Sequence, residues 1–319
     1  MTAAAFDITT LVRALIEAND LIKQIIVEER GFIPEGDLEW HPVNQGQPGH
    51  TEQVMFVQHF KPVNADLPNF GELKAWARWT AEECNKILTE HGFTIRLEAW
   101  PYDRQTFGVV AIYDLTIKWL VKGSVKNDLG YPYLINKRPA FHLGVSEAQI
   151  SFYDVGRGQP LVRIPGQKSG DYVCLIKWIR PLTGFELLDE VERLRAHLRT
   201  RRTLYQWGGV ILPNILLDEE VDISWLKSLW TKDETGQIWW VSQAKMQAKF
   251  ALGPEGARAR VAAAMAVTRE AVSIPRPDYV VDDNIILWME RDSVTSVPLF
   301  SAYVPKDNFA TQTVGLDSF

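Results

Sequence analysis

The pattern of apolar and polar residues opens with an amphipathic stretch. From residue 8 to 29, apolar side chains recur along one helical stripe, and Asp7 or Thr9 can cap its start. This predicts one long helix. Residues 31–50 are rich in Gly, Pro and polar side chains, and the apolar residues near Val54 are typical of a strand. The N-terminal part is therefore predicted to be a helix followed by a loop that leads into a sheet.

Three longer periodic stretches follow. Leu73–Leu88 has apolar residues at helical spacing, which predicts a second helix. Apolar residues alternate over Phe107–Val121 and again over Ile238–Leu252, so both stretches are predicted to be unusually long strands. Between them, short apolar segments around residues 161–164 and 172–179 also favour strands.

Further elements complete an α+β pattern. Thr183 and Glu186 have capping-box spacing and begin a helix, and a short helix is expected after Asp222. Near the end, two apolar strands within residues 285–304 are separated by ERDSVTS, a plausible hairpin turn. The chain contains no internal repeat and no linker between two cores. These features predict a single α+β domain over residues 1–319.

Composition narrows the function classes. The 319-residue chain has a formal net charge of -6 and a pI near 5.6, which argues against nucleic acid as a partner. The basic run 195–202 is interpreted as the solvated end of a helix. No apolar run approaches the roughly 18 residues of a membrane span, and the start MTAAAFDITT has no signal-peptide pattern. We therefore expect no membrane partner and a cytoplasmic or otherwise intracellular location.

Catalytic and metal motifs are missing from the sequence. Six histidines are dispersed, and no His, Cys or acidic cluster has metal-ligand spacing. The cysteines, Cys84 and Cys174, each lie among apolar residues and are expected to be buried thiols. No GxGxxG or GxxxxGK motif occurs. We expect no catalytic residue, no metal and no cofactor, and so not an enzyme.

A series of segments resembles the serpin family in order and spacing over roughly three quarters of the chain. The segments are AWARWTAEECNKI (75–87), VVAIYDLTIKW (109–119), RIPGQKSGDYVCLIKWIRP (163–181), VILPNILLDEEVDISWLKSLW (210–230), WWVSQAKMQAKFALGPEGARARVAAAMAV (239–267) and SIPRPDYVVDDNIILWMERDSVTSVPLFSAYV (273–304).

The resemblance implies a serpin-like architecture with a large main sheet, smaller sheets and surrounding helices. Residues 1–70 would form a divergent, shortened N-terminal part with a reduced helical region, residues 71–305 the serpin-like body, and residues 306–319 a C-terminal tail. The strands predicted at 107–121 and 238–252 match neighbouring serpin strands, so we expect them in the same large sheet. The 285–304 hairpin is expected to be buried in a smaller sheet.

Residues 253–277 resemble the serpin reactive loop, which is cleaved by a protease and then inserts into the main sheet as an added strand. Insertion requires that every second side chain fit a packed core. The hinge glycine and the alternate residues that follow it are all small or apolar: Gly256, Ala257, Ala259, Val261, Ala263 and Met265. Arg258 and Arg260 fall on the other face, so a shift by one residue would bury both arginines. Taken alone, the same stretch is also typical of an Ala-rich helix.

The resemblance places the scissile bond within a short window. Counting from the hinge gives Glu270 and Ala271, alignment on SIPR gives the bond before Ser273, and Arg269 also lies within the window. An acidic residue before the bond would suit proteases with a basic pocket, Arg269 would suit trypsin-like proteases, and Val272 would suit elastase-like ones.

Departures from the family leave two functions open. Two polar family positions near the sheet opening fall at Ala111 and Met246, and the sheet-top tryptophan falls at Trp119, which could equally be ordinary core. The hinge favours a protease inhibitor that acts as a suicide substrate. The short N-terminus and the two apolar replacements favour a non-inhibitory binding or structural subunit of a larger assembly. The expected partner is thus a protein, either a protease or an assembly subunit.

Overall fold

The computed structural model describes residues 3–69, 71–101, 105–156, 158–198, 203–257 and 276–316. The chain divides into two compact units, which are described separately. Unit 1 consists of residues 1–6, 115–219 and 249–319, and unit 2 consists of residues 7–114 and 220–248. The single-domain organisation expected from the sequence stays a prediction.

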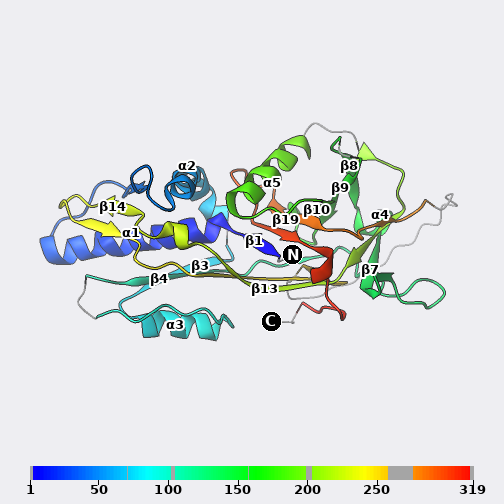
Figure 1. Ribbon diagram of the computed structural model, residues 1–319, viewed down its shortest axis with the longest axis horizontal. Helices are drawn as coiled ribbons and strands as arrows, with labels where there is room; N and C mark the ends of the chain where they lie inside the picture. The colour runs from blue at the N-terminus through cyan, green and yellow to red at the C-terminus, as the bar shows by residue number, and fades with distance from the viewer. Residues whose placement is uncertain are drawn as a thin grey trace. The chain divides into compact units, whose positions relative to one another are not determined.

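Unit 1 is built around a seven-stranded antiparallel sheet (Figure 1). In spatial order its strands are β1 (Ala4–Phe6), β20 (Phe300–Val304), β19 (Ile285–Arg291), β10 (Asp171–Lys177), β9 (Pro160–Pro165), β8 (Ser151–Asp154) and β11 (Thr203–Leu204). Helix α5 (Gly184–Leu198) packs on β1 and β20. Every residue of β19 is buried, which identifies the middle of this sheet as the core of unit 1.

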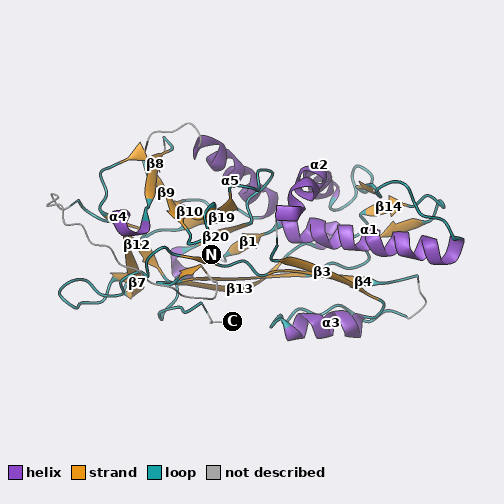
Figure 2. Ribbon diagram, turned by 180° about the vertical axis from the view of Figure 1, so that it is seen from behind, coloured by secondary structure: helices purple, strands orange, loops and turns teal. Residues whose placement is uncertain are grey.

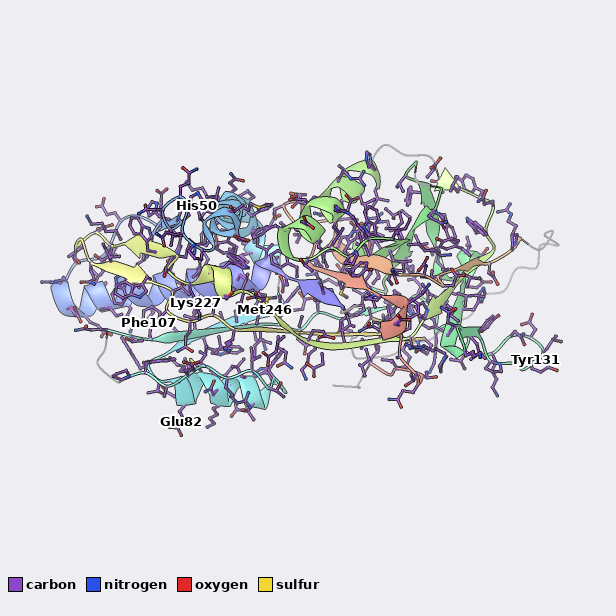
Figure 3. The ribbon with its side chains drawn as sticks, in the orientation of Figure 1. His50, Glu82, Phe107, Tyr131, Lys227 and Met246 are labelled. Carbon is purple, nitrogen blue, oxygen red and sulfur yellow. The ribbon has the colours of Figure 1, made fainter. Side chains whose placement is uncertain are left out.

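A second sheet of unit 1 has four strands in the order β18 (Tyr279–Val280), β12 (Gly209–Pro213), β7 (Arg138–Gly144) and β6 (Leu134–Ile135). The β12–β18 pair is parallel and the other pairs are antiparallel. A short helix, α4 (Val145–Ala148), follows β7, and the 3₁₀ turn η3 (Lys306–Asn308) follows β20. The loop before β6 projects from the sheet and carries the exposed Tyr131 at its tip (Figure 3).

Unit 2 places a two-stranded sheet between helices. Helix α1 (Ile8–Arg30) packs against one face of β3 (Leu73–Arg78) and β4 (Gly108–Tyr113), and α3 (Ala81–Glu90) packs against the other face (Figure 2). The α3 side buries Val110 and Ile112 of β4 in one cluster with Cys84, Ile87, Leu88 and Ile95. Because side chains alternate along a strand, Val109, Ala111 and Tyr113 face the α1 side.

The rest of unit 2 consists of a second helix, two 3₁₀ turns and a small sheet. Helix α2 (His50–Asp66) continues into the 3₁₀ turn η1 (Leu67–Asn69) and contacts a second 3₁₀ turn, η2 (Ser224–Leu226). A three-stranded sheet has the order β15 (Ile238–Trp240), β14 (Trp230–Lys232), β2 (Trp40–His41). Among the described residues, no helix is long and apolar enough to cross a membrane.

Two further strand pairs complete the described strands. Strand β13 (Ile215–Val221) pairs with β16 (Met246–Leu252), and β5 (Ile117–Lys118) pairs with β17 (Gly256–Ala257). The β5–β17 pair belongs wholly to unit 1.

Several sequence predictions are confirmed. The first helix spans Ile8–Arg30, and its cap is Asp7, whose carboxylate accepts hydrogen bonds from the backbone N–H groups of Thr9 and Thr10. The helix ends at Gly31, which adopts a left-handed conformation with φ 74°. The α5 helix, β9, β10 and the β19–β20 hairpin also lie where the pattern placed them. The fold class is α+β, as predicted.

Two N-terminal predictions are wrong. The residues near Val54 belong to α2 rather than to a strand. The helix predicted over Leu73–Leu88 begins only at Ala81, because Thr80 and Glu83 form a capping box there, and the preceding residues pair with β4 as β3. Trp76 and its apolar neighbours fit either periodicity, so the helical spacing was misleading in this half of the segment.

The predicted sheet arrangement is also wrong. The 107–121 stretch is divided into β4 and β5 around the exposed Asp114, and the 238–252 stretch is divided into β15 and β16. These four strands belong to four different sheets, and the 285–304 hairpin lies in the largest sheet rather than a smaller one. Ile286 and Trp288 are fully buried as expected, while Phe300 is partly buried.

Candidate functional site

The candidate site of unit 1 is the reversal of the chain between β16 and β17, which we call the hinge turn (Leu252–Ala257). Two backbone hydrogen bonds close it: Gly253 N donates to Gly256 O at 3.0 Å, and Gly256 N donates to Gly253 O at 3.2 Å. At its tip, Lys122 Nζ lies 2.6 Å from Glu255 Oε1. The turn therefore has a fixed geometry that directs the chain back beside β5.

Trp119, which directly follows β5 (Ile117–Lys118), forms two hydrogen bonds with the hinge turn. Its backbone N–H donates to Glu255 O at 3.3 Å, and its indole Nε1 donates to Gly253 O at 3.0 Å. The side chain is only 1% exposed. The structure thus brings together Trp119 and Gly256, two residues that the sequence analysis placed in the same functional region.

Both glycines of the turn lie where a side chain would not fit. Gly256 has φ +144°, and a Cβ there would lie 2.4 Å from the backbone oxygen of Ile117. A Cβ at Gly253 would lie 2.1 Å from the backbone oxygen of Val314. Close approach of backbone on both sides therefore requires glycine at both positions. The sequence analysis missed Gly253, although the Gly-Pro-Glu-Gly motif is a recognisable turn signal.

After the turn, β17 pairs with β5 in antiparallel orientation. Gly256 is opposite Lys118 and Ala257 is opposite Ile117. Ala257 is 1% exposed and Ile117 is 2% exposed. On its other edge the β5 segment contacts residues 166–167, because Gln167 N donates to Lys118 O at 2.9 Å. The first hinge residues are therefore already packed as a strand at the edge of β5.

The remaining reactive-loop predictions fall outside the described residues. This applies to Ala259, Val261, Ala263 and Met265 of the hinge, and to the scissile window Arg269, Glu270, Ala271, Val272 and Ser273. The other two sheet-opening positions belong to unit 2. Ala111 is opposite Ala75 in the β3–β4 pair, and Met246 begins β16 with 8% of its surface exposed (Figure 3).

Unit 2 contains a cavity of about 610 Å³ along the inner face of α1. Apolar α1 residues such as Leu11, Leu15 and Ile22 form one wall, and residues 105–109 and 237–245 form two others. Beside the cavity, Phe107 (Figure 3) and Trp239 pack against a buried cluster formed by Leu38 with Ile22 and Ile26 of α1. The cavity leaves the α1-facing side of β4 incompletely covered.

Residues 241–245 separate β15 from β16. Residues 243–247 lie beside segment 94–98. Two glutamine side chains, rather than backbone hydrogen bonds between strands, join these two segments. Gln243 exchanges two hydrogen bonds with the backbone of Glu98, at 2.8 and 2.9 Å, and Gln247 Oε1 accepts from Thr94 N at 2.7 Å and Ile95 N at 3.2 Å. The side-chain amides replace the strand pairing that the alternating pattern predicted.

Both cysteines are buried free thiols, as expected. Burial raises the pKa of Cys84 to about 11, and burial also raises the pKa of Cys174 well above its ordinary value. Both thiols are therefore protonated at neutral pH, and a buried thiol of this kind is a poor nucleophile.

The Trp119 contact gives a first testable prediction. Trp119→Phe removes the indole donor and leaves the Gly253 carbonyl unsatisfied, so we expect the free energy of unfolding to fall by about 2 kcal/mol. The matched control is Trp240→Phe, because Trp240 is 63% exposed and should change stability by less than about 0.5 kcal/mol. Urea unfolding measures both, and equal effects of the two changes would contradict the role assigned to Trp119.

Comparison with known proteins gives the fold its name. No family model matches the chain, and no curated protein matches it. Among solved structures it is similar to tengpin, a thermophilic serpin in its native state, at 9% identity over 95% of this chain and 88% of that one, with a TM-score of 0.50. It is also similar to the mouse protein Z-dependent protease inhibitor, at 11% identity over 95% and 91%, with a TM-score of 0.50.

A third similar structure is a serpin from the trematode Schistosoma haematobium, with 14% identity and a TM-score of 0.44. The match covers 73% of this chain but only 62% of that serpin. At such identities the likeness describes architecture and not activity. The architecture is α+β with one large antiparallel sheet, and the chain has the serpin fold.

Proposed function

We propose that the protein inhibits a protease by the suicide-substrate mechanism that the serpin fold supports. A protease nucleophile would attack the loop between residues 269 and 273 and form an acyl intermediate. The loop would then insert into the sheet and strand the enzyme before the intermediate is hydrolysed. In this mechanism the inhibitor supplies no catalytic residue of its own.

The observation that carries the proposal is the β17–β5 pair. Ala257 is buried opposite Ile117, so the chain leaves the hinge turn in the direction and register of an added strand. Continued along the sequence, the same register would place Ala259 opposite Leu115 and Arg260 opposite Asp114. Small residues would then share the face of Ala257, and a cross-strand ion pair would support the other face.

The cavity of unit 2 supports the same proposal. Strand β4, which precedes β5 in the sequence, has its α1-facing side bordered by this cavity at Val109. In the register above, Val261, Ala263 and Met265 would fall on the α1-facing side of the added strand. An apolar cavity can accept small and apolar side chains, because their burial leaves no charge without a partner.

The test compares substitutions at two neighbouring loop positions, one on each face of the inserted strand. Ala259→Arg would force a charge into the sheet core, and a penalty of about 3 kcal/mol or more corresponds to about a hundredfold slower insertion. The acyl intermediate would then be hydrolysed, and the variant would become a substrate. Arg258→Ala alters the outward face and should leave trapping nearly intact.

The assay mixes each variant with trypsin, elastase and a glutamate-specific protease, because the scissile window contains Arg269, Val272 and Glu270. Complexes that resist denaturant are separated by electrophoresis, and thermal stability is compared before and after loop cleavage. A wild-type chain that is cut in the loop, gains no thermal stability and retains none of the proteases would contradict inhibition.

That result would favour the second candidate function, a non-inhibitory binding or structural subunit. The observation in its favour is that Ala111 and Met246 are apolar where the family resemblance expects two polar residues at the sheet opening. Before β3 the described chain has the two helices α1 and α2, where the family resemblance expects a longer set of helices. Neither feature depends on a cleavable loop.

A further inference from the structure

The loop before β6 forms a hairpin in unit 1, which we call the projecting hairpin (residues 121–134). Its two arms are joined by a backbone hydrogen bond from Asn127 N to Tyr131 O at 2.9 Å. At its base, Ser124 and His142 of β7 exchange two backbone hydrogen bonds, at 2.9 and 2.8 Å. The hairpin is therefore a fixed extension of the four-stranded sheet.

The tip of the projecting hairpin exposes apolar side chains in a fixed geometry. Leu129 is 79% exposed, and Tyr131, which Figure 3 labels, is 67% exposed. The Asn127 side chain accepts hydrogen bonds from the backbone N–H groups of both residues, at 3.1 and 3.0 Å. Gly130 N also donates to Asn127 O at 2.9 Å. Because the turn is ordered before binding, a partner that covers these side chains pays less conformational entropy.

The charges of the projecting hairpin balance near its tip. Lys126 and Asp128 contribute one charge of each sign, and Lys122, at the start of the hairpin, is paired with Glu255. The exposed residues between Asp128 and Tyr133 carry no charge: Leu129, Gly130, Tyr131 and Pro132. A nucleic acid or an anionic lipid surface would require an excess of lysine or arginine. The tip instead fits an apolar patch on another protein, where tyrosine is enriched.

The first arm of the projecting hairpin contacts the hinge turn. Gly123 N donates to Pro254 O at 2.6 Å, next to the ion pair between Lys122 and Glu255. A Cβ at Gly123 would lie 2.7 Å from Phe141 Cδ2, so the backbone passes close to the sheet at this point. The hairpin therefore begins beside the N-terminal end of the reactive-loop segment.

The second arm of the hairpin reaches the C-terminal end of the same loop segment. The Tyr133 ring stacks on His142, with ring centroids 5.4 Å apart and an interplanar angle of 23°, and His142 Nε2 lies 3.2 Å from Asp278 Oδ1. Directly after β6, Asn136 Nδ2 donates to Asp282 O at 3.1 Å. Both described ends of the loop segment are thus held beside one hairpin.

We propose that the projecting hairpin is a second contact surface for the protease that attacks the loop, with Leu129 and Tyr131 covered by an apolar patch of that protease. Leu129 is five residues beyond Ser124, which is about 17 Å of extended chain, and a protease of about 230 residues has a radius of gyration of about 17 Å. A protein that binds the loop between its two anchored ends is therefore large enough to contact the tip at the same time. The inference rests on the proposed function only in that a protease must bind the loop.

The test measures the second-order rate constant at which a protease attacks the loop, counted as cleaved chain plus covalent complex. The probes are trypsin, elastase and a glutamate-specific protease, and the variants are compared with the protease that attacks the wild-type chain fastest. The double variant Leu129→Ala/Tyr131→Ala should lower this rate constant about tenfold or more, because truncation of central interface side chains has effects of this size.

Two controls separate the contact from other effects. Ile33→Ala removes an apolar side chain that is 80% exposed outside the hairpin and should leave the rate constant unchanged. Tyr131→Phe keeps the ring and should retain most of the wild-type rate constant, and a loss as large as that of the double variant would contradict an apolar contact. The midpoint of urea unfolding should be the same in all variants, since the altered side chains are exposed.

The hairpin contact and protease inhibition can fail separately. If the double variant is attacked more slowly but no chain retains a protease, inhibition is contradicted and the hairpin contact is supported. Equal rate constants for the wild type and the double variant would overturn the hairpin contact, whether or not covalent complexes form. Sedimentation measures self-association of the same chains. Self-association that the double variant abolishes, with an unchanged rate of attack, would also overturn the hairpin contact, because the tip would then bind a second copy.

Discussion

Arg291→Met is expected to lower the free energy of unfolding by about 3 to 5 kcal/mol. Arg291 and Asp171 face each other across the β10–β19 pair, and their side chains form two hydrogen bonds, at 2.6 and 2.8 Å. The side chains are only 6% and 2% exposed. Removal of the guanidinium leaves a carboxylate buried in the core of unit 1 with its principal partner gone, and the cost of that desolvated charge exceeds the value of the pair itself.

The control for this prediction is an ion pair of similar length that is more exposed, with side chains 28% and 22% accessible. Arg13 lies 2.9 Å from Glu17 on α1, and Arg13→Met should cost less than about 1 kcal/mol because water solvates the remaining carboxylate. A double variant, Asp171→Leu/Arg291→Met, should recover part of the loss, since no charge then stays buried. Urea unfolding of the three variants measures these differences, and an Arg291→Met effect as small as the Arg13→Met effect would contradict the prediction.

Gly256→Ala is the second change with a large expected effect. The new Cβ would lie 2.4 Å from Ile117 O and 2.7 Å from Lys118 Cα, both backbone atoms that cannot rotate away, and the residue would also keep an unfavourable φ of +144°. We expect β17 to leave β5 and the free energy of unfolding to fall by about 3 kcal/mol. The Trp119 indole N–H resonance, identified by its absence in Trp119→Phe, should shift at the same time.

The matched control is Gly130→Ala. Gly130 also has a positive φ, +81°, but nothing lies within 4 Å of its Cβ position. This change should therefore cost only the conformational preference, about 1 kcal/mol. If both substitutions have the same effect and the Trp119 resonance does not move, the close approach of β17 to β5 does not hold the hinge turn.

The serpin fold could be predicted from the order of segments that each resemble the family only weakly, whereas the strand pairing could not be predicted. Alternation over residues 107–121 correctly indicates extended chain, but hydrophobic periodicity does not tell which chain supplies the hydrogen bonds. Asp114 interrupts one stretch, and the Gln243 and Gln247 side chains take the place of a neighbouring strand in the other. Contacts of this kind join residues about 150 positions apart, and single-sequence patterns carry no information about them.

The candidate site was partly predictable for a physical reason. Gly256 and Trp119 could be named because the serpin resemblance places the hinge glycine and the sheet-top tryptophan of the family at these positions. Gly253 belongs to a recognisable Gly-Pro-Glu-Gly turn signal, but the need for glycine at this position comes from the backbone of Val314, which no local pattern reveals.

The glutamine contacts with segment 94–98 also have an entropic consequence. A backbone ladder fixes only main-chain torsions, whereas each bond from Gln243 or Gln247 also immobilises a long side chain, at up to about 2 kcal/mol of rotamer freedom. The net gain per bond is therefore smaller than in a regular sheet, and this segment can separate from residues 243–247 by side-chain rotation alone. Separation of segment 94–98 from residues 243–247 should therefore cost less free energy than unfolding unit 2 as a whole.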